Sequence, residues 1–205
     1  MVRRLVLVAA LLALTACGGS GASDRAVRAA DTMEHLRGVR FSLEAISVAT
    51  GSATLAGDLA LRYRATGKLA PPDRLRLDVT EPAPATLDIS GQSVRLNGQP
   101  ALPGILRTLA SPIAALEQLR ESGAVRFAGL GFARGNITAR YTVERGDRGV
   151  VEVELGLLDD LVRRQTFSIV QAIGGEGSGL TSVRTFYAIE YWDYGADPAD
   201  LGLGG

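Results

Sequence analysis

The chain has 205 residues, of which 46% are hydrophobic and 21% are charged, and its 22 basic residues balance its 22 acidic ones. These values predict a folded chain of one domain or two small ones, and the absence of a basic excess argues against a nucleic-acid binder. The single histidine, His35, and the single cysteine, Cys17, exclude a Cys/His zinc site, a disulfide framework and a multi-histidine metal centre.

The N-terminal segment has the pattern of an export signal. Arg3 and Arg4 form a positive region, and ten apolar residues follow from Leu5 to Leu14. A helix of that length covers about 15 Å, half of a hydrocarbon core of about 30 Å, so it is too short to span a membrane. We therefore predict a signal peptide over residues 1–16.

The residues Leu14-Thr15-Ala16-Cys17 resemble the bacterial lipobox, in which two small residues separate a leucine from a cysteine. The small residues let the signal peptidase close on the backbone, and the cysteine thiol accepts diacylglycerol. The alternative is a plain secretory signal whose cleavage site happens to precede a cysteine. Because Cys17 is the only cysteine and stands at the required place, we favour lipidation at Cys17.

Lipidation would divide the rest of the chain into an anchor and one domain. The run of glycine and serine after Cys17 predicts a flexible tether over residues 17–23. A single domain is expected over residues 24–205, since no further linker and no repeat is present. An acylated cysteine holds a protein on a bilayer, so we expect this domain on the extracytoplasmic side of the cell membrane.

Two segments have helical periodicity. The first covers residues 24–36, where apolar residues recur at a period near 3.6 before Gly38 ends the helix. The second begins with Ser111 as its N-cap and Pro112 at the first helical position, and Gly123 ends it.

Most of the remaining chain alternates apolar and polar residues with a period of two. This pattern predicts strands with one apolar face and one face in water. Short turn sequences separate the strands, which allows hairpins and leaves no room for helical crossovers, so the sheet is expected to be antiparallel. The alternating segments are 59–64, 74–79, 86–89, 93–97, 137–144 and 151–155.

A wide apolar sheet face with few helices to cover it has two outcomes. A curved sheet under a sparse helical roof encloses a cavity, whereas an ordinary α+β core is packed and dry. The residues alone leave this choice open. If a cavity forms, its lining is expected to come from the apolar strand faces and from residues 106–116; the candidates are Leu59, Leu61, Leu75, Leu77, Leu87, Ile89, Leu106, Leu109, Ile113 and Leu116.

The order of several segments resembles the LppX/LprG family of actinobacterial lipoproteins. After the lipobox come an opening strand at residues 38–44, a second strand at 56–59 and a helix at 111–119. A late strand at 161–164 follows an acidic turn, and residues 189–195 close the chain with Ile-Glu-Tyr-Trp-Asp-Tyr-Gly. The resemblance covers most of the chain after residue 16.

This resemblance implies an α+β, LolA-like fold, in which a strongly curved antiparallel half-barrel carries a few helices across its concave face. It also implies that the cavity binds multi-acyl lipid or glycolipid and that the protein helps to move this ligand across the cell envelope, with no catalytic residues. The expected partners are the membrane, the lipid ligand and a membrane transporter, and the chain is expected to be a monomer. One departure is a tight hairpin between Glu144 and Val162, where the family usually inserts a helix.

The acidic residues and a glycine-rich run offer alternatives to this interpretation. Glu152 and Glu154 share a strand face, and Asp159 and Asp160 share a turn, so paired carboxylates are available for acid–base work. A solvated strand face and turn-forming residues explain them better. The glycine-rich run at 129–135 lacks the GxGxxG spacing, and we expect a bent strand or loop. We predict no enzyme, no metal and no cofactor besides the covalent diacylglycerol; the alternative function is a dry-cored lipoprotein that binds a protein partner.

Overall fold

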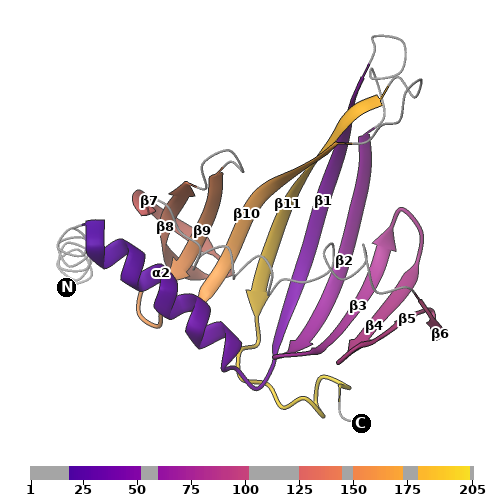
Figure 1. The fold of residues 1–205 in the computed structure, drawn as a ribbon. Helices are drawn as coiled ribbons and strands as arrows, with labels where there is room; N and C mark the ends of the chain where they lie inside the picture. The colour runs from indigo at the N-terminus through magenta and orange to yellow at the C-terminus, as the bar shows by residue number, and fades with distance from the viewer. Residues whose placement is uncertain (1–18, 52–59, 102–124, 145–149, 173–179, 204–205) are drawn as a thin grey trace.

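A computed structural model of the chain describes residues 19–51, 60–101, 125–144, 150–172 and 180–203 (Figure 1). Cys17, Leu59 and the predicted helix after Ser111 lie outside these residues. The described ranges contain one helix, α2 (Gly19–Glu34), and one sheet. Its strands are β1 (Val39–Gly51), β2 (Ala60–Ala70), β3 (Arg74–Glu81), β4 (Ala85–Ser90), β5 (Ser93–Leu96), β6 (Gln99–Pro100), β7 (Val125–Ala133), β8 (Asn136–Glu144), β9 (Val150–Gly156), β10 (Val162–Ala172) and β11 (Leu180–Trp192).

The sheet is antiparallel throughout and has the order β6-β5-β4-β3-β2-β1-β11-β10-β9-β8-β7. Neighbours in sequence pair within β1 to β6 and within β7 to β11, and β1 pairs with β11 in the middle. Two meanders are thus joined by their first and last strands. Among the described strands, β6 and β7 each have one partner, so the sheet stays open and curves without closing (Figure 1). The antiparallel sheet expected from the alternating pattern is confirmed.

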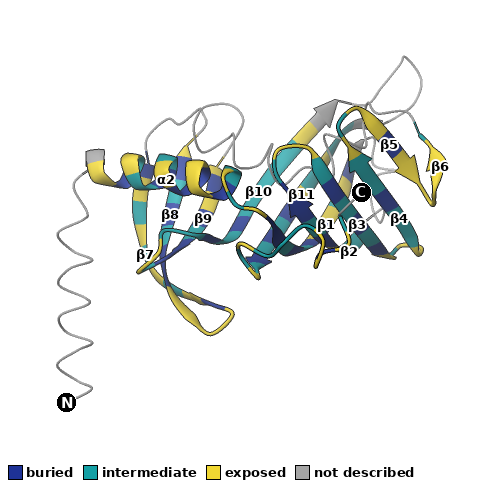
Figure 2. Ribbon diagram, turned by 90° about the horizontal axis from the view of Figure 1, so that it is seen from below, coloured by how far each residue is buried: buried dark blue, intermediate teal, exposed yellow. Residues whose placement is uncertain are grey.

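The pairing register aligns apolar residues across the sheet. Phe41 of β1 lies opposite Tyr191 of β11 and Gly67 of β2, and Gly67 in turn lies opposite Leu77 of β3. We call the face that carries these residues, on which α2 packs, the inner face, and the opposite face the outer face. Buried residues follow the inner face along the strands and the underside of α2 (Figure 2).

Helix α2 lies across the half of the sheet that contains β7 to β10 (Figure 1). Its buried side is made of small residues and one methionine, which let the helix approach the strands closely; these are Ala22, Ala26, Ala29, Ala30 and Met33. The helix begins at Gly19, earlier than the predicted start at Asp24. Residues 19–23, which were expected to form a flexible tether, are therefore helical, because Ala22 packs into the core.

The side chain of Arg25 fixes α2 to the turn between β9 and β10. Its Nε donates to the carboxylate of Asp160, and its Nη1 donates to the Tyr141 hydroxyl at 3.2 Å. Its Nη2 donates to the carbonyl oxygens of Gly156 and Leu157, each at 3.0 Å. Burial lowers the pKa of Arg25, but the hydrogen bond and charge of Asp160 and the contact with Tyr141 outweigh burial and raise that pKa above its ordinary value.

Two further expectations on local structure can be compared with the strands. The glycine-rich run at 129–135 forms the bent second half of β7 and the turn after it, with a register shift between Phe127 and Gly129. Between residues 150 and 162 the chain forms β9 and a turn, without a helix. Residues 145–149 of the predicted hairpin lie outside the described part.

The ring of Phe41 lies directly over the backbone of Gly67, and we predict that Gly67→Ala destabilises the fold. An added Cβ would lie 2.1 to 2.6 Å from three ring atoms of Phe41, which is 0% exposed and has no room to move. The expected loss is about 1–3 kcal/mol of unfolding free energy in urea. Thr66→Val, on the exposed side of the same strand, should change that free energy by no more than about 0.5 kcal/mol. Equal stability of both variants would contradict this packing.

Candidate functional site

The inner face of the sheet is free of charge over its central part. The described positions of this face on β1 to β4, β9 and β11, and from Gln165 to Ile169 on β10, hold no acidic or basic residue. Such a surface suits an apolar ligand, because an unpaired charge is costly to remove from water. The polar groups that remain are hydroxyls and the amide of Gln165.

An aromatic row crosses this face. The rings of Phe167 on β10 and Tyr187 on β11 are stacked, with centroids 4.9 Å apart and planes inclined by 14°. Ala45 of β1 lies opposite both Tyr187 of β11 and Tyr63 of β2, so this small residue lies between the two tyrosines. Phe167 and Tyr63 are only partly buried, whereas Tyr187 is buried.

Burial decreases along the long strands from one end to the other. Phe41, near the start of β1, is 0% exposed, and the aromatic row lies further along the same strand, at Ala45. One step further along β2 from Tyr63, Leu61 is 56% exposed although it belongs to the same inner face. The inner face is therefore closed beside the C-terminal segment and accessible toward Leu61.

Hydroxyl groups gather at the accessible end. The Oγ of Ser47 and the Oγ1 of Thr185 are 2.9 Å apart, one position beyond the aromatic row. Burial raises the pKa of Tyr63, and the neighbouring Tyr187 raises it further. Burial also raises the pKa of Tyr187, and this effect outweighs a hydrogen bond with Thr185 that lowers it. Both phenols stay neutral at physiological pH, so this region offers hydrogen bonds without charge.

The predicted cavity residues divide into three groups. Leu75, Leu77 and Leu87 are buried on the inner face, and Ile89 is partly buried beside them, since Leu75 pairs with Ile89 and Leu77 with Leu87. Leu61 shares the inner face but is exposed. The remaining candidates lie outside the described residues: Leu59, Leu106, Leu109, Ile113 and Leu116.

The aromatic row was not among the cavity candidates predicted from the sequence. Tyr63 continues the alternation of Leu61, and this signal alone could have added it. Phe167 and Tyr187 join the row only through the pairing of β10 with β11 and of β11 with β1, which no local pattern specifies.

The acidic residues considered for acid–base chemistry have structural contacts. Glu154 accepts a hydrogen bond from the Thr138 hydroxyl at 2.7 Å, and Glu152 is 3.5 Å from the Thr166 hydroxyl, both on the outer face. Asp159 and Asp160 pair with Arg163 and Arg25. Within the described ranges, no three histidine, cysteine or acidic side chains are close enough to hold a metal ion.

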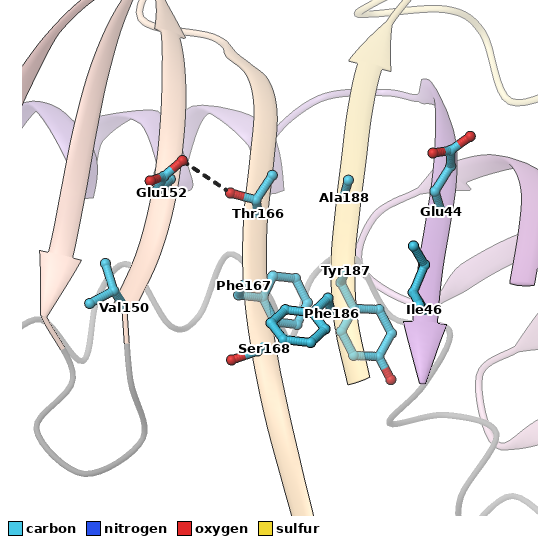
Figure 3. A pocket seen from close by; sticks show the side chains of 10 residues that line it. All are labelled: Glu44, Ile46, Val150, Glu152, Thr166, Phe167, Ser168, Phe186, Tyr187 and Ala188. Atoms are coloured by element: carbon cyan, nitrogen blue, oxygen red, sulfur yellow. Dashed lines mark hydrogen bonds between the residues drawn. The ribbon is translucent and has the colours of Figure 1, made fainter. Parts of the chain in front are cut away.

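The outer face carries a groove of about 480 Å³ that sequence reasoning did not anticipate (Figure 3). It lies on the side of the sheet opposite α2, over β9, β10, β11 and β1. The Phe186 side chain lies near its middle, between Ile46 and Val150. The other lining residues are Glu44, Glu152, Thr166, Ser168 and Ala188, together with Phe167 and Tyr187, whose side chains belong to the inner face.

Comparisons with known proteins identify the fold. No family model matches the chain, and no curated protein matches its sequence. The lipoprotein LppX of Mycobacterium tuberculosis aligns over 87% of this chain and 97% of its own, with 12% identity and a TM-score of 0.50. LprF from Mycobacterium bovis aligns over 85% and 93% (8% identity, TM-score 0.45). A LolA superfamily protein from Nitrosomonas europaea aligns over 84% and 92% (9% identity, TM-score 0.37).

The likeness to LppX concerns the fold, since the sequences are only 12% identical. The chain has an open, curved, antiparallel half-barrel of the LolA type, and the fold expected from the sequence resemblance is confirmed. In the part of the chain that the structure describes, no helix has the length and hydrophobicity needed to cross a bilayer.

The buried tyrosines predict a loss of stability at alkaline pH. Burial raises the pKa of Tyr194 to about 12 and raises the pKa of Tyr63, Tyr187 and Tyr191 as well. In the unfolded chain these phenols ionise near pH 10, so the stabilisation is complete below about pH 10 and is lost as the pH rises toward 12. Urea unfolding across this range measures the loss, and ultraviolet difference spectra report the ionisation. Tyr194→Phe should make the fall shallower, and a free energy that stays constant up to pH 12 would exclude this linkage.

Proposed function

We propose that the chain is a membrane-anchored extracytoplasmic lipoprotein that binds acyl lipid or glycolipid on the inner face of its sheet and aids its transport across the cell envelope. The observation that carries the proposal is the uncharged inner face, which is buried at one end and accessible at the other. The LolA-type fold, shared with the lipoprotein LppX, agrees with it.

The inner face has the chemistry that an acyl chain requires. Each methylene group removed from water contributes about 0.8 kcal/mol, so a chain lying along the partly buried Phe167, Tyr63 and Ile169 would gain several kcal/mol. Rings and aliphatic side chains contact such a chain without a directional requirement. The neutral hydroxyls near Ser47 and Thr185 supply hydrogen bonds for an ester or sugar group at the accessible end. This role is one of binding and carries no catalytic step.

A second candidate function is a protein-interaction module with a dry core. Its support is the complete burial of Phe41, Leu77 and Leu155, which shows that part of the inner face is filled. Lipid content distinguishes the two candidates, because a dry core leaves no place for an acyl chain.

The first test is lipid binding by the full chain carrying Cys17→Ser, which removes the acyl acceptor. After incubation with mixed phospholipid and glycolipid vesicles, native mass spectrometry should detect a bound lipid. Leu61→Trp should reduce this binding severalfold with little change in stability, because Leu61 is 56% exposed and the indole finds room. Thr66→Trp, on the outer face of the same strand, serves as the matched control. A lipid-free mass under all conditions would favour the dry-core alternative.

The second test concerns the anchor. If Cys17 carries the diacylglycerol, Cys17→Ser should move the protein from the membrane fraction to the soluble fraction of an expressing bacterium, because acylation is needed to hold the domain on the bilayer. Metabolic labelling with a radioactive fatty acid should fail in the same variant. Labelling that persists after the substitution would refute the assignment.

A further inference from the structure

Four large apolar side chains are exposed in the half of the sheet on which α2 packs. The β7–β8 hairpin contributes three of them on the inner face, since Leu130 pairs with the buried Ala139 and Phe132 pairs with Ile137. The turn between β9 and β10 contributes the fourth. We define the hairpin cluster as Leu130, Phe132, Ile137 and Leu158, which are between 49% and 99% exposed.

A backbone hydrogen bond joins the turn to the hairpin. The N–H of Leu157 donates to the carbonyl oxygen of Ile137 at 3.3 Å, and Leu158 follows directly in the chain. This hairpin and turn lie at the end of the sheet where β8, β10 and β1 begin and where β9 and β11 end. Leu61, by contrast, pairs with Ser47 toward the other end of β1. The hairpin cluster is therefore remote from the accessible end of the inner face.

The start of α2, which lies beside β7 and β8 (Figure 1), brings the hairpin cluster close to the predicted anchor. Cys17 stands two residues before Gly19, a separation of at most about 7 Å whatever the conformation. From Gly19, the helix covers about 9 Å to Arg25. The Nη2 of Arg25 donates to the carbonyl oxygens of Gly156 and Leu157, each at 3.0 Å. An acyl chain on Cys17 that is inserted in a bilayer therefore holds the β9–β10 turn near that bilayer.

The charged groups beside the hairpin cluster have partners within the protein. The two carboxylates of the β9–β10 turn, Asp159 and Asp160, each pair with an arginine. In the hairpin turn, the guanidinium group of Arg134 lies 3.7 Å from the centre of the Trp192 ring and 3.5 Å from a carboxylate oxygen of Glu190. These groups keep their partners in a less polar medium, which costs less than the burial of an unpaired charge.

We propose that the hairpin cluster docks on the lipid bilayer that holds the acyl chains of Cys17, with Leu158 and Phe132 inserted at the level of the headgroups. This inference rests on the lipid anchor of the proposed function. Exposed apolar side chains gain free energy when they leave water at the boundary between headgroups and acyl chains. The anchor presents that boundary at a high effective concentration, so a weak apolar contact suffices to keep the surface docked.

Docking at this end of the sheet orients the domain. Leu61 lies toward the other end of the strands, so the accessible end of the inner face is directed away from the docked hairpin cluster. A ligand can then pass to another protein or membrane while the domain stays docked. The anchor therefore fixes the direction in which the inner face opens, in addition to holding the protein at the membrane.

Fluorescence of a labelled chain in vesicles tests the contact. The full chain is produced in a bacterium, purified with Cys17 acylated and reconstituted in phosphatidylcholine vesicles. Because Cys17 is the only cysteine, acylation leaves an introduced thiol as the sole site for a nitrobenzoxadiazole dye. With Leu158→Cys or Phe132→Cys, nitroxide-bearing lipids should quench the dye about threefold more strongly than with Leu96→Cys, since only the first two positions enter the bilayer. Leu96 is a matched control, an exposed leucine of β5 in the other half of the sheet.

Urea unfolding of the labelled variants should match that of the unsubstituted chain, because the three positions are exposed. Equal quenching at all three would overturn the proposal, and so would a blue shift of the emission without quenching, which indicates contact with a protein surface. Dye uptake by the unsubstituted chain would show that Cys17 carries no acyl group, and would remove the anchor together with this contact. None of these results depends on lipid binding by the inner face, which the Cys17→Ser chain tests separately.

Discussion

The separation of charged residues from apolar residues between the two faces of one sheet is the constraint on which the rest of the structure depends. Successive residues of a strand point to opposite faces, so a single register keeps Arg64, Glu44 and their neighbours in water and keeps Phe41 and Tyr191 in the core. A shift of one residue would place arginines against apolar side chains, at a cost that no local rearrangement could offset. The docking of α2, the aromatic row and the neutral tyrosines all require this register.

Much of the fold could be predicted from the sequence, because alternation is a local property. The strands that contain Leu75, Leu77, Leu87 and Ile89 alternate clearly, and their facing pairs follow from short turns. Alternation identifies the face of a side chain but not its depth along the strand, so the exposure of Leu61 could not be predicted. The helical start at Gly19 was missed because glycine and serine indicate flexibility, whereas packing against the sheet decides the outcome.

The candidate site was less predictable than the fold, since its parts come from distant segments. Arg25 and Asp160 are 135 residues apart, and no local pattern indicates that this residue of α2 pairs with this residue of the β9–β10 turn. The aromatic row and the groove of the outer face lie back to back on the same strands, with Tyr187 and Phe186 adjacent in sequence. One short segment of β11 therefore contributes to an apolar surface on each side, and the sequence alone cannot assign either surface a role.

The pairing of the first strand with the last has a consequence for how the protein reaches its folded state. Ser47 and Thr185 are 138 residues apart, so the contacts in the centre of the sheet have a high contact order and form slowly. Synthesis proceeds from the N-terminus, so β1 is complete long before β11 has been made and can pair with it. Until then the hairpins of β1 to β6 expose an unpaired hydrogen-bonding edge, which is prone to aggregate. Completion of the sheet therefore coincides with release of the C-terminal segment, and a chain that stops short of β11 lacks the strand that joins its two halves.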